Sequence, residues 1–323
     1  MMNSDKALIT EQQIKLLLSY AVLAPSSHNT QPWRFEITDG TVFMFADETR
    51  ALAISDPNSR ELYISCGCAL MNLRAAAAHE GFSISINVEP ASGDDALLAV
   101  ISFNKQHSSS LKDAELFKSI ESRRTYRKNF ASKDIPNEIL DSLRMTASKE
   151  DTWLEFITLE ESRRIVAELI SEGDSIQWSN PNWRKELASW ILPRHQGGGL
   201  TMHPFLVPVA RAIVRTLDMG MGIAAKNKQL TAKSPALAVL GTANDNVTDW
   251  LKTGQSLEKV LLSAHSKGLQ AAYFNQPIQV ASLRPKLQSL LKKTGVPQVV
   301  ISLGFPKDQI GASPRRRLDE VIK

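Results

Sequence analysis

The chain has 323 residues, of which 43% are hydrophobic and 22% are charged, and its formal net charge is +4. This composition is typical of a globular protein of about two domains. The mild positive charge does not call for nucleic acid, although it suits an anionic small ligand. Because no apolar run is long enough to span a membrane and no apolar signal core follows the N-terminus, we expect a cytoplasmic protein without a membrane partner.

Hydrophobic periodicity predicts alternating helices and strands in the first third of the chain. These are helices over 11–23 and 60–80, a strand or hairpin arm around Gly40 over 34–46, and strands over 82–89 and 97–103. The polar run His107–Ser110 is the best linker candidate. We therefore predict a first unit over 1–107 and a second over 108–323.

The second unit is predicted to contain the same kinds of element around one irregular segment. The elements are helices over about 111–122, 136–147, 160–172 and 249–267 and strands over 153–158, 236–242 and 296–304. The irregular segment, 178–233, has three tryptophans, a run of three glycines, and eight basic residues against two acidic ones.

A weak internal repeat relates the two units. Gly67 and Gly81-Phe82 match Gly254 and Gly268-Leu269 at an offset of 187 residues, whereas the two Trp-led strands match at an offset of 120. The jump between the offsets is accounted for by the segment 178–233, which we interpret as an insert. The sequence therefore favours two tandem copies of one α+β unit over chance similarity between Ala- and Leu-rich helices.

Polar turn-forming residues are unusually dense between the first helix and the first strand, over 24–35. Ser26, Ser27 and Asn29 are suited to hydrogen bonding with the edge of a polar heterocycle, and Gln31 to holding the loop itself. The residues alone leave open whether this is a binding loop or a well-capped strand entry.

Two arginine clusters lie far apart in the sequence. One contains Arg123, Arg124 and Arg127, and the other is the run Arg315–Arg317. Arginine matches phosphate oxygens in pairs, so the clusters could clamp one phosphate, and the hydroxyl of Thr125 could add a donor. The alternative is two solvated basic patches.

Other site chemistries lack their motifs. The six histidines have no metal-ligand spacing, and there is no Gly-x-Ser-x-Gly, Gly-x-Gly-x-x-Gly or phosphate-loop motif. Cys66 and Cys68 are two apart on a predicted helix and are poor candidates for a disulfide or a metal site. We expect no metal and no side-chain nucleophile.

The motifs together resemble those of the FMN-dependent nitroreductases. Residues 24–33 are similar to that family's PSSxNxQPW loop, Arg123-x-Thr125-x-Arg127 to its Arg-x-Ser-x-Lys/Arg motif, and residues 314–318 to its C-terminal basic motif. The whole chain is most similar to the Acg-like subgroup, in which two such units are fused. The resemblance implies an α+β fold with two fused units, each an antiparallel or mixed sheet flanked by helices, forming a pseudo-dimer.

The resemblance also implies one composite FMN site for each chain, because the loop occurs only in the first unit and the arginine motif only in the second. Asn275 and Gln276 match, by spacing, the family's position beside the reactive edge of the flavin. The implied FMN-binding residues are Pro25, Ser26, Ser27, Asn29, Arg123, Thr125, Arg127, Asn275, Gln276, Arg315 and Arg317.

The implied activity is hydride transfer from NADH or NADPH through FMN to an unknown small-molecule acceptor, with the flavin supplying the chemistry and no catalytic side chain. In the Acg-like subgroup an insert such as 178–233 acts as a lid, with Trp183, Trp190 and Phe205 as candidates to cover the ring and Gly197–Gly199 as its flexible part. A closed lid would block nicotinamide, so the alternative is a protein that stores FMN with little turnover. We expect a monomer that is an internal pseudo-dimer, with further pairing into a homodimer left open.

Overall fold

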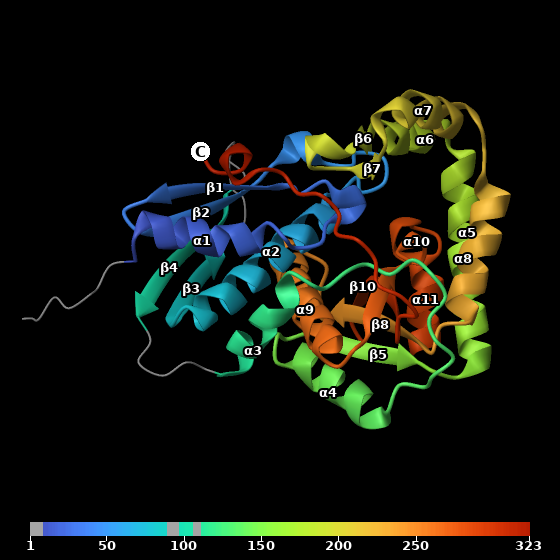
Figure 1. Ribbon diagram of the computed structural model, residues 1–323. Coiled ribbons are helices and arrows are strands. Elements are labelled where there is room, and N and C mark those ends of the chain that lie inside the picture. The colour runs from blue at the N-terminus through green and yellow to red at the C-terminus, as the bar shows by residue number, and fades with distance from the viewer. Residues whose placement is uncertain (1–8, 89–96, 106–110) are drawn as a thin grey trace, which may run out of the picture.

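The computed structural model describes residues 9–88, 97–105 and 111–323 (Figure 1). The predicted linker His107–Ser110, and with it the boundary between 107 and 108, lies outside the described residues. Among those residues, no helix combines the length and the apolar character needed to cross a bilayer.

The first unit is a four-stranded antiparallel sheet with two helices. Its strand order is β1-β2-β4-β3. The elements in chain order are α1 (Glu11–Ala21), β1 (Trp33–Thr38), β2 (Thr41–Ala46), α2 (Arg60–His79), β3 (Phe82–Val88) and β4 (Leu97–Lys105).

The second unit repeats this topology with the strand order β5-β8-β10-β9. Its corresponding elements are α4 (Asn137–Ser148), β5 (Trp153–Ile157), β8 (Ala236–Thr242), α9 (Val247–Ser266), β9 (Gln270–Tyr273) and β10 (Val296–Gly304). Three further helices are α3 (Leu111–Ile120), which precedes the unit, and α10 (Gln276–Gln279) and α11 (Arg284–Leu291), which connect its last two strands.

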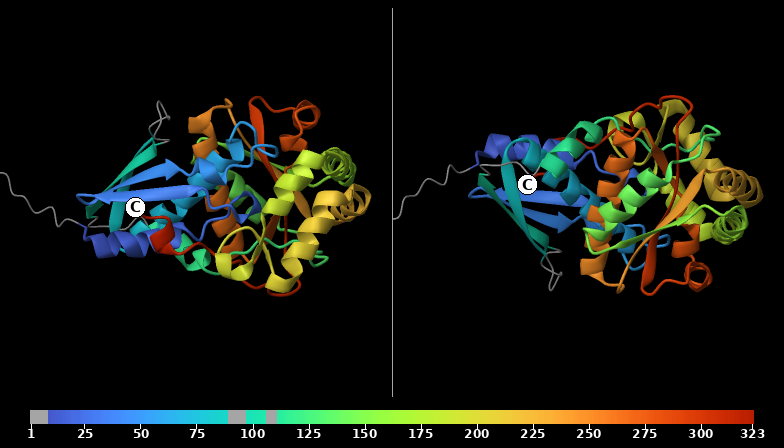
Figure 2. Two further views of the ribbon diagram at one scale, coloured as in Figure 1. Left: turned by 90° about the horizontal axis from the view of Figure 1, so that it is seen from above. Right: turned by 90° about the horizontal axis from the view of Figure 1, so that it is seen from below.

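The helices α2 and α9 pack against each other where the two units meet (Figures 1 and 2). A Cβ atom added at Gly67 would lie 2.2 Å from the Leu251 carbonyl oxygen, and one added at Gly254 would lie 2.0 Å from the Ile64 carbonyl oxygen. The two contacts are equivalent under the offset of 187, which relates Ile64 to Leu251 and Gly67 to Gly254, so the repeat brings its two copies together about a local two-fold axis. The predicted α+β fold of two fused units is confirmed.

Where the first unit has a tight hairpin between β1 and β2, the second unit has a long, mainly helical segment between β5 and β8. This segment, residues 158–235, is called the excursion below. It contains α5 (Glu160–Ser179), α6 (Pro181–Ser189), β6 (Ile191–Pro193), β7 (Leu200–Met202), α7 (Val207–Thr216) and α8 (Gly220–Ala232). In Figure 1, α5 and α8 run side by side along the second unit, and the segment between them folds back toward the first. The predicted insert 178–233 lies within this longer excursion.

The first helix of the excursion extends seven residues beyond the predicted end at 172. Gly173 permits this, because a Cβ atom there would lie 2.6 Å from the Gln276 Cβ atom. Helix α5 therefore continues past α10, and its last turns reach the junction of the two units.

The excursion is anchored to the first unit at two places. The Glu186 carboxylate on α6 accepts hydrogen bonds from the backbone N–H groups of Ile54 and Ser55 at 2.7 and 2.8 Å. The Gly199 N–H donates to the Asn29 carbonyl oxygen at 3.1 Å. The glycine run, expected to be the flexible part of a lid, is instead one of its attachment points.

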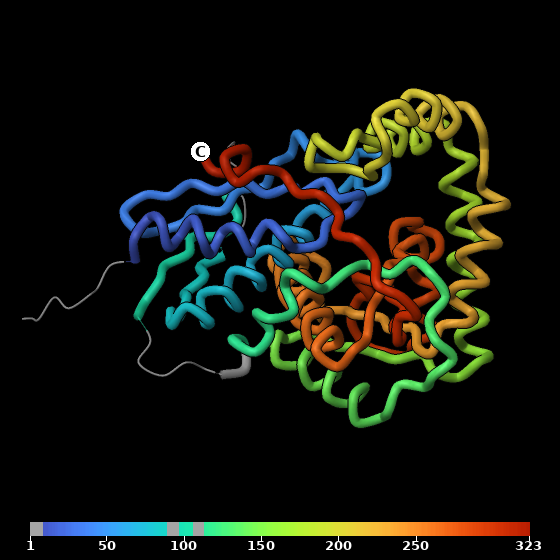
Figure 3. Tube along the Cα trace, viewed as in Figure 1, coloured from blue at the N-terminus to red at the C-terminus, as the bar shows by residue number. Residues whose placement is uncertain are grey.

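The C-terminal segment crosses from the second unit to the first (Figure 3). The Phe35 N–H donates to the Val321 carbonyl oxygen at 2.7 Å, and the Lys323 N–H donates to the Phe35 carbonyl oxygen at 2.9 Å. This pairing along β1 fixes the arginine run Arg315–Arg317 against the loop that precedes β1.

Candidate functional site

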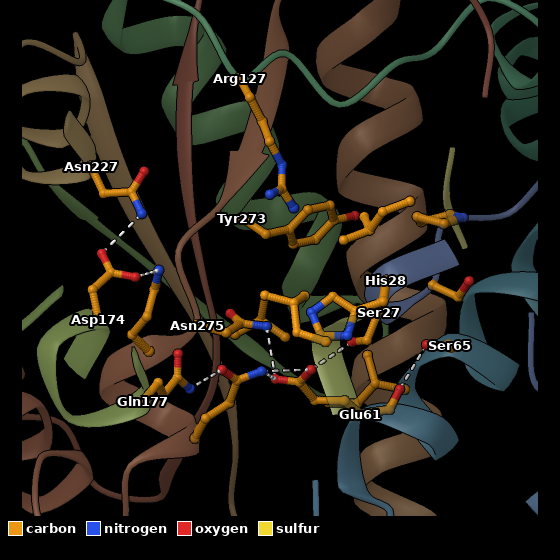
Figure 4. Close-up of a pocket in the computed structure, with 18 of the residues that line it drawn as sticks. Ser27, His28, Glu61, Ser65, Arg127, Asp174, Gln177, Asn227, Tyr273 and Asn275 are labelled. Carbon is orange, nitrogen blue, oxygen red and sulfur yellow. Dashed lines mark hydrogen bonds between the residues drawn. The ribbon is translucent and has the colours of Figure 1, made fainter. Parts of the chain in front are cut away.

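A cavity of about 290 Å³ lies where the two units and the excursion meet. Its wall combines polar residues of the loop before β1, of α2 and of the segment after β9 with two tryptophans of the excursion. Figure 4 shows several of the polar side chains directed into the same space.

The loop before β1 reaches the cavity in a conformation that is costly for its residues. His28, Asn29 and Gln31 all have positive φ angles, of 48°, 55° and 52°, and each such non-glycine residue costs roughly 1 kcal/mol or more. The Ser26 hydroxyl accepts a hydrogen bond from the Gln31 N–H at 2.9 Å, which holds the loop in shape. Of the loop residues predicted to bind, Pro25, Ser26 and Ser27 line the cavity.

Asn29 is turned away from the cavity. Its amide donates to the carbonyl oxygens of Gly199 and Pro314 at 3.3 and 3.1 Å. Gln31 acts similarly, donating to the Gly197 carbonyl oxygen at 2.8 Å and accepting from the Arg316 N–H at 2.9 Å. Both side chains therefore hold the excursion and the C-terminal segment against the loop.

Glu61, at the start of α2, joins the two units beneath the cavity (Figure 4). Its carboxylate accepts hydrogen bonds from the Ser27 hydroxyl at 2.5 Å, the Asn275 amide at 3.1 Å and the Gln279 amide at 3.0 Å. The sequence motifs do not indicate Glu61 as a site residue. The available signal was a charged residue at the head of an otherwise apolar helix.

Arg127 points into the cavity near Tyr273 (Figure 4). Burial lowers the pKa of its guanidinium, with partial compensation from Tyr273 and Asp174. The Tyr273 hydroxyl, Gln276 Oε1 and His28 Nδ1 are buried without a hydrogen-bond partner among the described residues. The wall thus offers both donors and acceptors to a polar ligand.

Asn275 and Gln276, whose spacing matches a position beside the edge of a ligand, both line the cavity. The Asn275 side-chain oxygen Oδ1 accepts from the Val300 N–H at 2.9 Å, and the Gln276 side-chain amide donates to Asp174 at 2.9 Å. Since these bonds fix both side chains, the free Gln276 Oε1 has a defined direction.

Arg123 and Arg315 meet at a second buried cluster. Arg123 is 6% exposed, and its Nε lies 3.2 Å from Glu258 Oε1 on α9. Arg315 donates to the carbonyl oxygens of Leu23 and Ala24 at 2.9 and 3.2 Å. Burial, and then the charge of Arg123, lowers the pKa of Arg315 to about 10, so the structure brings the two distant arginine motifs together.

The remaining two predicted residues are placed differently. The backbone of Thr125 lies beside Ala271 in a parallel bridge. The Arg317 side chain is 77% exposed and pairs with Asp319 at 2.6 Å, so the structure does not bring it to the cavity or to the buried cluster.

The excursion covers one side of the cavity. Trp178 and Trp183 line it and pack edge to face, with ring centroids 5.4 Å apart. Of the other two aromatic residues considered as covers, Trp190 stacks on Arg50 at 5.3 Å and Phe205 is 85% exposed, and neither lines the cavity. Sequence reasoning also missed Asp174 and Asn227, because their convergence depends on how α5 and α8 pair.

The counterpart of the loop before β1 in the second unit lies in a network of charged side chains. The loop before β1 has its counterpart in 149–152, where Glu150 accepts from Arg74 at 2.7 Å and from Lys259 at 2.8 Å. Lys259 also pairs with Asp113 at 3.0 Å. The second unit therefore has an ion-pair network beside the counterpart of the polar loop. In the described part of the chain, no group of three His, Cys, Asp or Glu side chains is arranged to hold a metal ion.

The chain is similar over nearly its whole length to curated proteins named as nitroreductases. It is 27% identical over 320 residues to "Putative NAD(P)H nitroreductase Rv3131" of Mycobacterium tuberculosis, covering 97% of this chain and 91% of that one. It is 26% identical over 321 residues to "Putative NAD(P)H nitroreductase acg" of the same organism, covering 98% and 96%. "Probable NAD(P)H nitroreductase PigM" of a Serratia species is 21% identical over 340 residues, covering 97% and 93%. No family model matches the chain.

These relatives confirm the resemblance that the motifs predict. The similarity includes the protein named acg and spans both units and the excursion, rather than one unit alone.

Proposed function

We propose that the chain is an FMN-binding oxidoreductase that transfers hydride from NADH or NADPH to a small-molecule acceptor. The observation that carries this proposal is a cavity between the two units into which Arg127 points, and whose wall holds the Tyr273 hydroxyl and Gln276 Oε1 buried without a hydrogen-bond partner among the described residues. A flavin ring offers hydrogen-bond acceptors and a donor along one polar edge, and its phosphate requires cations. The similarity to proteins named as NAD(P)H nitroreductases supports the same activity.

The residues present fit the cofactor. Arg127 is suited to donate to an oxygen or nitrogen of the flavin's pyrimidine end, and Gln276 Oε1 to accept from its ring N–H. Ser26 and Ser27 would contact it from the first unit, and Arg123 and Arg315 would hold the phosphate. When bound, FMN supplies the hydride and electron transfer, and the protein supplies position and electrostatics.

The second candidate is storage of FMN with little turnover. It is favoured by the cover that α6 and β7 form over the cavity, since Trp183, Leu187 and Leu200 line it and Glu186 attaches α6 to the first unit. Nicotinamide must reach the flavin on the side of the cavity that this cover occupies, so an attached cover would slow or prevent reduction of the flavin.

One titration separates the candidates. The purified chain should show the absorbance bands of flavin, and NADPH or NADH should bleach them under anaerobic conditions. Bleaching within seconds to minutes supports the oxidoreductase, whereas bound flavin that dithionite bleaches and neither nicotinamide does supports storage. A chain that cannot be loaded with FMN contradicts both.

A further inference from the structure

A buried carboxylate occupies the centre of the cluster that joins the two arginine motifs. Glu258 on α9 has no exposed surface, and its Oε1 lies 3.2 Å from Arg123 Nε. The pair lacks hydrogen-bond geometry, and neither carboxylate oxygen accepts a hydrogen bond from any described residue. The Nε atoms of Arg123 and Arg315 also have no hydrogen-bond partner there. Fully buried polar atoms are rarely left unpaired, so this cluster is incomplete without a ligand.

Each element around Glu258 contributes a titratable group that faces it. Arg123 comes from the segment after α3, Arg315 from the C-terminal segment, Cys68 from α2 and Tyr273 from β9. Arg124 adds a third positive charge close to Arg123 and Arg315. The cluster therefore has an excess of positive charge around one negative group.

We propose that Glu258 takes up a proton when a phosphate group binds to this arginine cluster. The inference rests on the proposed function, because the phosphate is taken to be that of FMN. A dianionic phosphate beside an ionised carboxylate would be repelled, and a carboxylate can only accept hydrogen bonds. A protonated Glu258 removes the repulsion, donates its O–H to a phosphate oxygen, and frees Arg123 to bind the phosphate with both of its forked donors.

The pKa of Glu258 in the free protein agrees with this role. Burial raises the pKa of Glu258 to about 7, against the opposing effects of Arg123 and Arg315. Glu258 can therefore take up a proton from solution near neutral pH, so phosphate binding does not require an acidic solution. We expect phosphate binding to weaken as the pH rises above this value.

The test compares FMN with riboflavin, which lacks the phosphate, on the full-length apo-protein. Quenching of flavin fluorescence gives the affinity of each between pH 6 and 8. If binding requires the protonated acid with a pKa of about 7, wild-type affinity for FMN should fall about tenfold relative to Glu258→Gln over this range. Comparison with the variant cancels the ionisation of the FMN phosphate itself. Riboflavin affinity should show no such difference.

Calorimetry on the unmutated protein provides a second measurement that does not depend on the variant folding. Titrations at pH 8 in buffers of different ionisation enthalpy should show uptake of close to one proton for each FMN bound, and none for riboflavin. Glu150→Gln, which alters a half-buried acid in the ion-pair network of Arg74 and Lys259, serves as the matched control and should leave the ratio of FMN to riboflavin affinity unchanged.

Two results would overturn the inference while leaving the proposed function in place. One is FMN binding without proton uptake; the other is a Glu258→Gln variant that binds FMN more tightly by the same factor at every pH, which would make Glu258 a fixed counter-charge. Failure of both FMN and riboflavin to bind at any pH would instead contradict the proposed function itself.

Discussion

At the scale of single residues, the cavity and the adjoining arginine cluster together hold several polar atoms that are buried without a hydrogen-bond partner among the described residues. Tyr273, Gln276 and Glu258 are the main examples. Each costs stability in the free protein, since a buried polar group loses its water without a replacement. The concentration of such groups in one region is what a pre-formed site for a polar ligand requires.

Arg127→Leu should therefore separate stability from binding. Desolvation at the cavity lowers the pKa of the Arg127 guanidinium, so its removal should raise the melting temperature of the apo-protein, while flavin affinity should fall by about 1.5–3 kcal/mol, which is the value of a hydrogen bond to a charged group. Differential scanning fluorimetry and fluorescence titration measure the two effects. Arg317→Ala is the matched control from the C-terminal motif, because Arg317 is exposed and paired with Asp319; a loss of affinity as large in the control would contradict the assignment.

The raised pKa of Asp56 predicts that the stability of the protein depends on pH. Burial, and then the charge of Glu61, raises its pKa from 3.8 to about 6. The folded state therefore binds the proton more tightly than the unfolded state, so this contribution to stability is complete below about pH 4 and is lost as the pH rises through 6. Asp56→Asn keeps an acceptor for the Leu62 N–H and should be more stable than wild type at pH 8 by on the order of 2 kcal/mol. Urea unfolding at pH 4 and pH 8 tests this, and an equal difference at both values would count against it.

At the scale of elements, the sequence predicted most helices and strands of the two units, but not β9, α10 or α11, nor which residues attach the excursion to the first unit. The Trp-led strands, the glycine helix ends and the repeat offset are local signals, and the structure agrees with them. The attachment of Gly197 and Gly199 to the loop was not predictable, because a glycine run indicates conformational freedom and not the partner that fixes it. The convergence of Asp174 and Asn227 likewise depends on the pairing of α5 with α8.

Glu186→Ala should release the cover from the cavity. The carboxylate makes three hydrogen bonds to residues 54 and 55, and hydrogen bonds to a charged group contribute roughly 1.5–3 kcal/mol each. Amide hydrogen exchange over 181–202 should increase, and bound flavin should dissociate faster. Glu172→Ala, which breaks an exposed ion pair with Lys286 on the same excursion, is the control. Exchange rates that match wild type in both variants would mean that the latch does not hold the cover.

At the scale of the whole molecule, the two units form a pseudo-dimer with unequal halves. The first contributes the polar loop, the second contributes both arginine motifs, and the C-terminal segment returns to pair with β1. The motifs predicted this division of the site. They did not predict Glu61 or Glu258, whose function depends on the packing of α2 against α9 and of both helices against the cavity wall.

The ion-pair network beside the counterpart of the polar loop predicts one flavin for each chain. The positive charges of Arg74 and Lys259 are balanced there by Glu150 and Asp113, so the network offers no free positive charge to a second phosphate. The ratio of flavin absorbance, after release by denaturation, to protein concentration should approach one. A ratio near two in fully loaded protein would show that flavin also binds beside this network.

The close approach of Gly67 and Gly254 should make the junction of the units intolerant of any side chain. In Gly254→Ala the new Cβ atom would lie 2.0 Å from a backbone oxygen and 2.7 Å from the Gly67 Cα atom, neither of which can rotate away. Helices α2 and α9 would have to separate, opening the core between the units, so we expect a loss of more than about 3 kcal/mol in the free energy of unfolding. Gly222→Ala is the matched control, because it lies in helix α8 with no atom within 4 Å of the added Cβ, and alanine there should be neutral or stabilising by up to about 1 kcal/mol. Urea unfolding of both variants measures the difference, and a Gly254→Ala protein as stable as wild type would mean that the two units are not held in this contact.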